Sequence, residues 1–157
     1  DTELQKAASL DLQGRAAIAN AKIAYERFKT VFSGDRWERL AGHGARVQRL
    51  LWASTGTKNP NYPDTLYVDG LIGPHTVNTL PPATLGAFID HGMVAPALDA
   101  GVDEAKRHLD RLKSLGIDID AITARLEDEG VRAFAASFDA LMNSISTKRS
   151  EVSQPCR

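Results

Sequence analysis

Apolar residues recur along most of the chain with the spacing of an α-helix. The first such stripe is rich in alanine, which permits close packing against a sheet, and consists of Ala17, Ala21, Ala24, Phe28 and Val31. Asp35 is a plausible N-cap for a short helix that follows and reaches Leu40. A proline in the first turn and Gly92 after the last residue predict a further helix over residues 83–91.

The C-terminal part of the chain has a helical period throughout. One apolar face precedes Gly116 and is formed by Val102, Ala105, Leu109 and Leu112. Asp118 can cap the next helix, which should turn residues 119, 122 and 126 inward. Gly130 interrupts the period, and a seam follows that is formed by Val131, Phe134, Phe138, Leu141 and Ile145. We expect this seam to be core, since a globular helix must bury one face; the alternative is a partner-binding groove.

Two short segments break the helical pattern and predict β-strands. Residues 49–53 form an apolar run without a helical period, and residues 76–80 are rich in threonine and valine before two prolines. Strands separated by helices pair in parallel through right-handed crossovers. Two parallel strands expose both edges, whereas a closed (β/α)8 barrel takes about 250 residues. The order of elements therefore predicts an α/β protein, predominantly helical in this chain, that forms the C-terminal portion of a TIM barrel with strands seven and eight.

Composition narrows the class of protein. Of the 157 residues, 43% are hydrophobic and 25% charged, which is typical of a soluble globular protein. The net charge of −1 gives no electrostatic case for a nucleic acid or an anionic membrane as partner. The single cysteine, Cys156, fits a cytoplasmic protein. Because Asp1 is not an initiator methionine, we expect a chain that starts after cleavage or belongs to something longer. Residues 1–147 should form the barrel part, and 148–157 a disordered tail.

The loop that follows the first strand carries the candidate chemistry. Residues 54–58 supply hydroxyl groups, backbone N–H groups and the ammonium of Lys58. These groups suit a phosphate or a carboxylate, because hydroxyls and amides give directed hydrogen bonds and lysine gives a point charge. Ligands of α/β proteins also bind at the carboxyl ends of strands. The alternative is an ordinary Ser/Thr/Gly turn with a solvated lysine.

The remaining titratable candidates have plain interpretations. His43 and His75 lie beside glycine or proline and should be exposed loop residues. His91 lies at a helix C-terminus, where the helix dipole favours its charged form. Residues 127–129 form an acidic cluster, for which a solvated helix end is favoured over a catalytic pair of carboxylates.

Three contiguous motifs stand out: Trp52-Ala53-Ser54-Thr55-Gly56-Thr57-Lys58-Asn59-Pro60, Tyr62-Pro63-Asp64-Thr65-Leu66-Tyr67-Val68 and Gly73-Pro74-His75-Thr76-Val77-Asn78-Thr79-Leu80-Pro81. Together they resemble the C-terminal part of transaldolases, closest to the long bacterial type, which also occurs fused to glucose-6-phosphate isomerase. The likeness extends outward. Asp1-Thr2-Glu3 resembles the segment just after the sixth strand of the family, and residues 126–131 resemble its closing helices.

The resemblance implies transfer of a dihydroxyacetone unit from sedoheptulose 7-phosphate to glyceraldehyde 3-phosphate in the pentose phosphate pathway. A lysine on the fourth strand of the family forms a Schiff base, and carboxylates on early strands handle protons. No metal or organic cofactor is used. By the resemblance, these catalytic groups, together with a serine and an arginine of the phosphate site, all lie before Asp1. The implied partners are sugar phosphates and the N-terminal remainder of the barrel.

Within this chain, the resemblance assigns the substrate phosphate to Lys58, with Ser54 and Thr55 as neighbours. The family often has arginine where Lys58 stands, and lysine cannot grip a phosphate in bidentate fashion. Lys58 is not favoured as the imine lysine, because it follows the strand in a polar loop and Schiff-base lysines are usually desolvated. Asn78 is expected to point into the barrel, without an assigned role. Two rival hypotheses are a non-enzymatic helical interaction module and a bifunctional enzyme with an isomerase domain.

Overall fold

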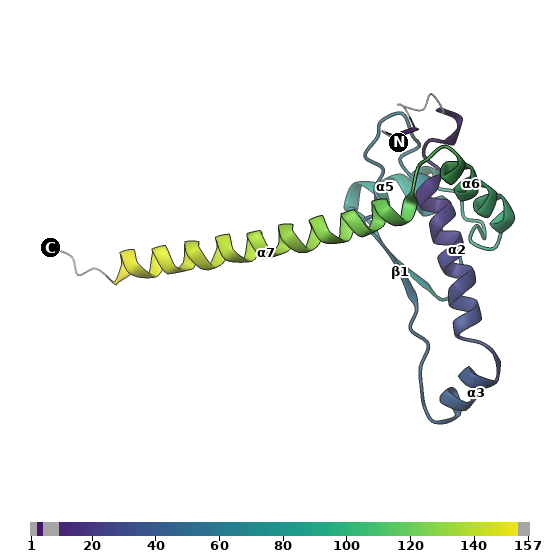
Figure 1. Cartoon of the computed structure of the whole chain (residues 1–157), viewed down its shortest axis with the longest axis horizontal. Helices are drawn as coiled ribbons and strands as arrows, with labels where there is room; N and C mark the ends of the chain where they lie inside the picture. The colour runs from purple at the N-terminus through teal and green to yellow at the C-terminus, as the bar shows by residue number, and fades with distance from the viewer. Residues whose placement is uncertain (1–2, 5–9, 154–157) are drawn as a thin grey trace. The chain divides into compact units, whose positions relative to one another are not determined.

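The computed structural model describes residues 3–4 and 10–153 and divides the chain into two compact units, the first ending at Ile117 and the second starting at Asp118. The first unit holds a two-stranded sheet and most of the helices, and the second is a single long helix (Figure 1). In chain order the elements are η1 (Leu10–Leu12), α2 (Ala16–Val31), α3 (Gly34–Gly42), β1 (Leu50–Ala53), α4 (Leu66–Asp69), β2 (Thr76–Thr79), α5 (Pro82–His91), α6 (Val102–Ser114) and α7 (Ile119–Val152).

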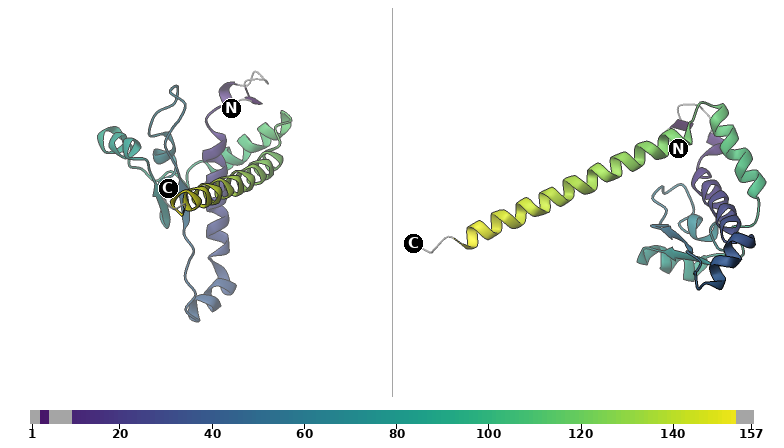
Figure 2. Two further views of the ribbon diagram at one scale, coloured as in Figure 1. Left: turned by 90° about the vertical axis from the view of Figure 1, so that its left-hand side faces the viewer. Right: turned by 60° about the horizontal axis from the view of Figure 1, so that its bottom comes forward.

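Helix α2 forms the centre of the first unit. It packs along α6 on one side and contributes to the main apolar cluster, which consists of Ala21, Tyr25, Phe28, Leu71 and Leu98 (Figure 2). The predicted alanine stripe is confirmed at Ala21 and Phe28, whereas Val31 at its end is 41% exposed. Tyr25 was not in the predicted stripe; its ring is buried and its hydroxyl donates a hydrogen bond to the Pro74 carbonyl at 3.2 Å. The buried face of α2 therefore includes the aromatic side chains of Tyr25 and Phe28 beside Ala21.

The two predicted strands are present and pair in parallel. Leu50 lies opposite Thr76, and Ala53 lies opposite Thr79. Leu50 and Trp52 pack against the apolar cluster, so this face of β1 is turned toward the helices. Side chains alternate along a strand, and Leu51, on the opposite face, is 52% exposed. Among the described residues no third strand joins the sheet, so both of its edges are unpaired.

The predicted helices of the first unit are present, with one correction at a cap. Helix α5 begins at Pro82, in agreement with the first-turn proline. Helix α3 begins at Gly34 with Ser33 in the N-cap position, so the prediction of Asp35 as N-cap is wrong. Asp35 lies in the first turn instead, where a carboxylate still interacts favourably with the helix dipole.

Helix α7 is continuous through Gly130, so the predicted interruption there is wrong. Its start is as predicted: the Asp118 carboxylate accepts a hydrogen bond from the backbone N–H of Ala121 at 3.0 Å. The helix also continues through residues 148–152, where we expected a tail; residues 154–157, with Cys156, lie outside the described residues. The division of the chain after residue 147 stays a prediction.

No residue of α7 is buried, which contradicts the predicted burial of its apolar seam within this chain. The exposed seam residues include Phe134 at 82% and Phe138 at 62%. Such a seam requires a cover, because a contiguous apolar face in water is costly. Among the described residues, none of the helices has both the length and the apolar character that a bilayer crossing requires.

Candidate functional site

The loop of residues 54–58 lies at the carboxyl edge of the sheet. It follows β1 directly, and the parallel register brings the end of β2 alongside, with Ala53 opposite Thr79. This is the edge at which open α/β proteins bind their ligands. The sequence-based placement of the loop is therefore confirmed, whereas the roles of its residues remain predictions.

Ser54 has a backbone conformation that few non-glycine residues adopt. Its φ angle is +56°, in the left-handed region, where a side chain costs roughly 1–3 kcal/mol of strain. The Ser54 N–H group points at the Thr79 hydroxyl oxygen at 3.4 Å, and the Thr79 hydroxyl lies 3.5 Å from the Trp52 carbonyl oxygen. Strain of this kind persists only where neighbouring structure enforces it, and it is concentrated at functional sites.

Thr55 is buried, with 5% of its surface exposed. Its hydroxyl donates a hydrogen bond to the side-chain oxygen of Asn78 at 2.7 Å. Asn78 lies opposite Trp52 in the ladder and so projects from the same, helix-facing side of the sheet. The expectation that Asn78 points into the barrel is therefore wrong, because the interior would be the opposite face.

Gly56 and Thr57 allow the loop to lie close to its neighbours. A Cβ atom on Gly56 would come within 3.0 Å of the Pro81 ring and 3.1 Å of the Thr84 hydroxyl, so glycine permits contact with the start of α5. The Thr57 hydroxyl donates to the carbonyl oxygen of Asp64 at 3.3 Å, which connects the loop to the segment just before α4. Lys58 is exposed.

Two of the three predicted phosphate-site residues line a common cavity. Ser54 and Thr55 border a groove of about 340 Å³ together with β1 and the alanine side of α2, including Ala17 and Ala24. Lys58 is not among the residues that line this groove. The structure therefore brings Ser54 and Thr55 together at the strand end and leaves the ammonium of Lys58 in solvent.

His91, the last residue of α5, is bonded to Asp64 in the segment that follows the loop. Its Nε2 lies 2.9 Å from an Asp64 carboxylate oxygen, and its Nδ1 lies 3.0 Å from that of Asp90. The hydrogen bond to Asp64, with that to Asp90, raises the pKa of His91 above its usual 6.5. The same bond from His91 lowers the pKa of Asp64 below its usual 3.8. His91 thus has a specific partner, which its position at a helix end did not predict.

We expect the tether between His91 and Asp64 to depend on pH. Because the pKa of His91 is raised in the folded state, its contribution to stability is complete below about pH 6.5 and is lost as the pH rises through the raised value. Asp64, whose pKa is lowered, contributes above about pH 3.8 and loses that contribution as the pH falls through its lowered value. NMR titration of labelled histidine in the full-length protein should give His91 a pKa above 6.5.

The control for this titration is Asp64→Asn, which should return the pKa of His91 toward 6.5, while Asp90→Asn should have the smaller effect. The side chains of His91 and Asp64 are 51% and 63% exposed, so added salt should also reduce the shift. A His91 that titrates at or below 6.5 in the unmodified protein would show that the tether does not form.

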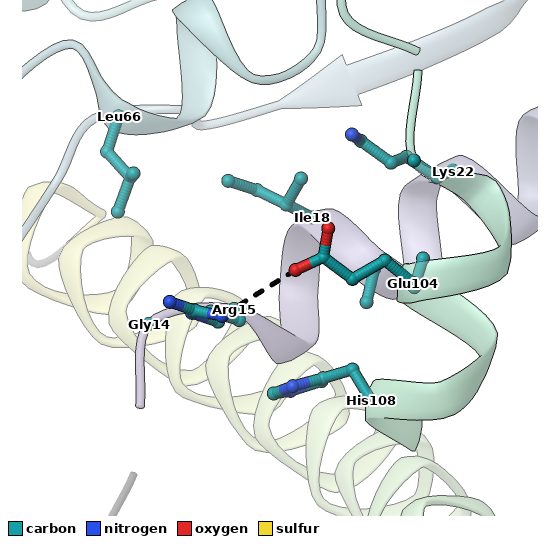
Figure 3. Close-up of a pocket in the computed structure, with 10 residues that line it drawn as sticks. Gly14, Arg15, Ile18, Lys22, Leu66, Glu104 and His108 are labelled. Carbon is teal, nitrogen blue, oxygen red and sulfur yellow. Dashed lines mark ion pairs between the residues drawn. The ribbon is translucent and has the colours of Figure 1, made fainter. Parts of the chain in front are cut away.

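A second cavity, of about 270 Å³, lies between α2 and α6 and contains a residue that the sequence analysis missed (Figure 3). His108 is buried, and its Nε2 has no hydrogen-bond partner among the residues that the structure describes. Burial, followed by the charges of Arg15 and Arg111, lowers the pKa of His108. The helical spacing from Ala105 to Leu112 could have identified it as part of the buried face. No residue of the 54–58 loop lines this cavity.

A family model and individual known proteins both match this sequence over most of its length. The family model described as Transaldolase/Fructose-6-phosphate aldolase matches residues 1–145. The chain is 52% identical over 139 residues to "Transaldolase 2" of Nostoc sp. strain PCC 7120, covering 87% of this chain and 36% of that protein. It is 52% identical over 137 residues to "Transaldolase" of Thiobacillus denitrificans, covering 87% of this chain and 38% of that protein.

A third relative is "Transaldolase" of Neisseria meningitidis serogroup A, which is 50% identical over 131 residues, covering 83% of this chain and 37% of that protein. The chain thus spans little more than a third of the length of the curated relatives it matches. This family implies a TIM barrel, and a two-stranded parallel sheet with helices packed against one face is consistent with part of one. The chain belongs to the transaldolase/fructose-6-phosphate aldolase family.

Proposed function

We propose that the complete protein is a transaldolase that transfers a dihydroxyacetone unit from a ketose phosphate, such as sedoheptulose 7-phosphate, to an aldose phosphate, such as glyceraldehyde 3-phosphate. This places it in the pentose phosphate pathway. The observation that carries the proposal is the identity of 50–52% with proteins named transaldolase over most of the chain. The cytoplasmic location expected from the cysteine content remains a prediction.

We further propose that β1 and β2 are strands seven and eight of the barrel and that α2 is the helix after strand six. The parallel register and the two unpaired sheet edges support this, because a barrel would add one strand at each edge. The groove beside the alanine side of α2 and the edge of β1 leaves room for such a neighbour. The exposed seam of α7 would find its cover on the rest of the barrel.

The site for the substrate phosphate is assigned to the loop that carries Ser54, Thr55 and Lys58. Support comes from the position of the loop at the carboxyl edge and from the strained backbone of Ser54. Lys58 is exposed on a flexible stem, so its ammonium can reach a dianion that approaches this edge. A phosphate bound here would keep the sugar carbonyl at a fixed distance from this loop and direct it toward the interior of the barrel.

The covalent step belongs to the part of the barrel outside this chain. In the proposed mechanism a lysine amine on strand four adds to the ketose carbonyl and releases water. A carboxylate takes the proton of the hydroxyl that becomes the new aldehyde, the protonated imine accepts the electron pair of the cleaved carbon–carbon bond, and the aldose product leaves. The enamine that remains attacks the acceptor aldehyde, whose oxygen takes up a proton, and water then hydrolyses the new imine to release the ketose product and the free lysine. The contribution of this chain is orientation, since a fixed phosphate lowers the entropy that is lost on reaching the reactive geometry.

An interaction module is the second candidate function, and the exposed seam of α7 is the observation that favours it. An assay of the full-length protein separates the two. Transaldolase activity should appear as glyceraldehyde 3-phosphate-dependent consumption of sedoheptulose 7-phosphate, with release of erythrose 4-phosphate. A full-length, folded protein that fails to exchange these sugars would exclude the enzymatic proposal and leave the interaction role.

A further inference from the structure

We propose that Thr55 and Asn78 act as a positioning pair: their side-chain hydrogen bond fixes the loop that presents Ser54 and Lys58, and the Thr55 hydroxyl is not itself a phosphate ligand. This inference rests on the proposed function and refines the role expected for Thr55. It also gives Asn78, to which the sequence assigned nothing, a part in the site.

The donor capacity of Thr55 is the first argument. A threonine hydroxyl has one hydrogen, and that of Thr55 is donated to Asn78 at 2.7 Å. A phosphate dianion offers only acceptor oxygens, so it needs donors from the protein. With its hydrogen committed, the Thr55 hydroxyl would present lone pairs to the phosphate, which is unfavourable. Thr55 is also 95% buried, by its exposed fraction of 5%, whereas Ser54 and Lys58 are exposed.

The location of Asn78 is the second argument. Asn78 lies within β2, where its neighbours are held by the parallel ladder to β1. Its side chain lies on the helix-facing side of the sheet, away from the face that would line the barrel interior. Asn78 can therefore act on the substrate only through another residue. The hydrogen bond to Asn78 attaches Thr55 to a rigid strand, and Thr55 lies between the strained Ser54 and the closely packed Gly56.

The restraint matters because of what surrounds it. Ser54 must be kept at a φ of +56°, which relaxes unless the next residue is fixed. Its own N–H group makes only a long contact of 3.4 Å to the Thr79 hydroxyl. The Thr55–Asn78 bond, at 2.7 Å, is the shorter of these two restraints and lies in the drier environment, so it should dominate.

The test is a double-mutant cycle in the full-length enzyme. Thr55→Val removes the hydroxyl at constant shape, and Asn78→Leu removes the acceptor at similar volume. Each should lower kcat/KM for fructose 6-phosphate by roughly five- to 150-fold, the range expected for a lost hydrogen bond with one partner left unsatisfied. The double variant should lose no more than the worse single variant, and Thr55→Ser should restore most of the activity.

Thr57→Val is the matched control, because it makes the same chemical change in the same loop. The Thr57 hydroxyl is bonded to the Asp64 carbonyl and not to Asn78. Its effect should therefore add to that of Asn78→Leu. If Thr55 were a direct phosphate donor, Thr55→Val would instead add to Asn78→Leu, and Asn78→Leu alone would cost little. Either result would overturn the pair.

Free fructose distinguishes positioning of the phosphate from general destabilisation. Thr55→Val and Asn78→Leu should change turnover of free fructose by less than twofold, because that substrate has no phosphate to hold. Equal losses on both substrates would show that the pair supports the whole barrel, and the proposal would be wrong. Failure of the proposed function is separate and would appear as absent transaldolase activity in the unmodified enzyme.

Discussion

Borohydride reduction in the presence of fructose 6-phosphate is expected to leave every lysine of this chain unmodified. Reduction traps a Schiff base as a stable secondary amine, so the adduct marks the imine-forming lysine. An imine lysine must be neutral at working pH, which requires burial or a neighbouring cation. Lys58 is exposed in a polar loop. The chain alone should therefore exchange no dihydroxyacetone units, a complete loss relative to the full-length enzyme.

The positive control is the full-length enzyme treated in the same way, in which peptide mapping should place the adduct upstream of Asp1. Omitting borohydride, or replacing the sugar by one without a carbonyl at the second carbon, should abolish labelling. A sugar adduct on Lys58, or on any other lysine of residues 1–157, would overturn the assignment of the chemistry to the rest of the barrel.

Lys58→Met should lower kcat/KM for phosphorylated substrates by about ten- to a hundredfold in the full-length enzyme. Methionine keeps the stem and removes the charge, and a charge-assisted hydrogen bond is worth roughly 1.5–3 kcal/mol, at about 1.4 kcal/mol per factor of ten. The loss should appear in KM if the contact stabilises ground and transition states equally, and in kcat if it also orients the imine. Steady-state kinetics with fructose 6-phosphate measures both.

Two controls isolate the phosphate. Free fructose should be turned over by Lys58→Met almost as well as by the unmodified enzyme. Lys113→Met, in the last turn of α6, makes the same chemical change at another exposed lysine and should leave the kinetics unchanged. Equal damage to phosphorylated and free sugar would show that Lys58 is not a phosphate anchor.

Local patterns predicted the strands and the site loop well. An apolar run bounded by turn residues predicted β1 within one residue, and threonine and valine before two prolines predicted β2 equally closely. These signals are local, because hydrophobic period and turn chemistry involve only near neighbours. The loop of residues 54–58 followed from the end of β1, so its place at the carboxyl edge could be predicted as well.

Register and long-range partners could not be predicted in the same way. The face to which Asn78 belongs depends on where β2 pairs with β1, and a shift by one residue reverses every side chain. The bond from Thr55 to Asn78 and the tether from His91 to Asp64 each join residues more than twenty positions apart, which no local pattern encodes. The prediction that Gly130 interrupts the helix was wrong for another reason, because glycine destabilises a helix by only about 1 kcal/mol relative to alanine. Helix α7 continues through it.

The uncovered seam of α7 and the two unpaired strand edges make the stability of this part of the protein a matter of mass action. Within one polypeptide, the rest of a barrel is present at a high effective concentration and covers these surfaces without a bimolecular step. If the connection were cut, the same contacts would have to be regained by association, and the folded fraction would fall with dilution. The covalent link between the two parts would then contribute to stability without making a single contact of its own.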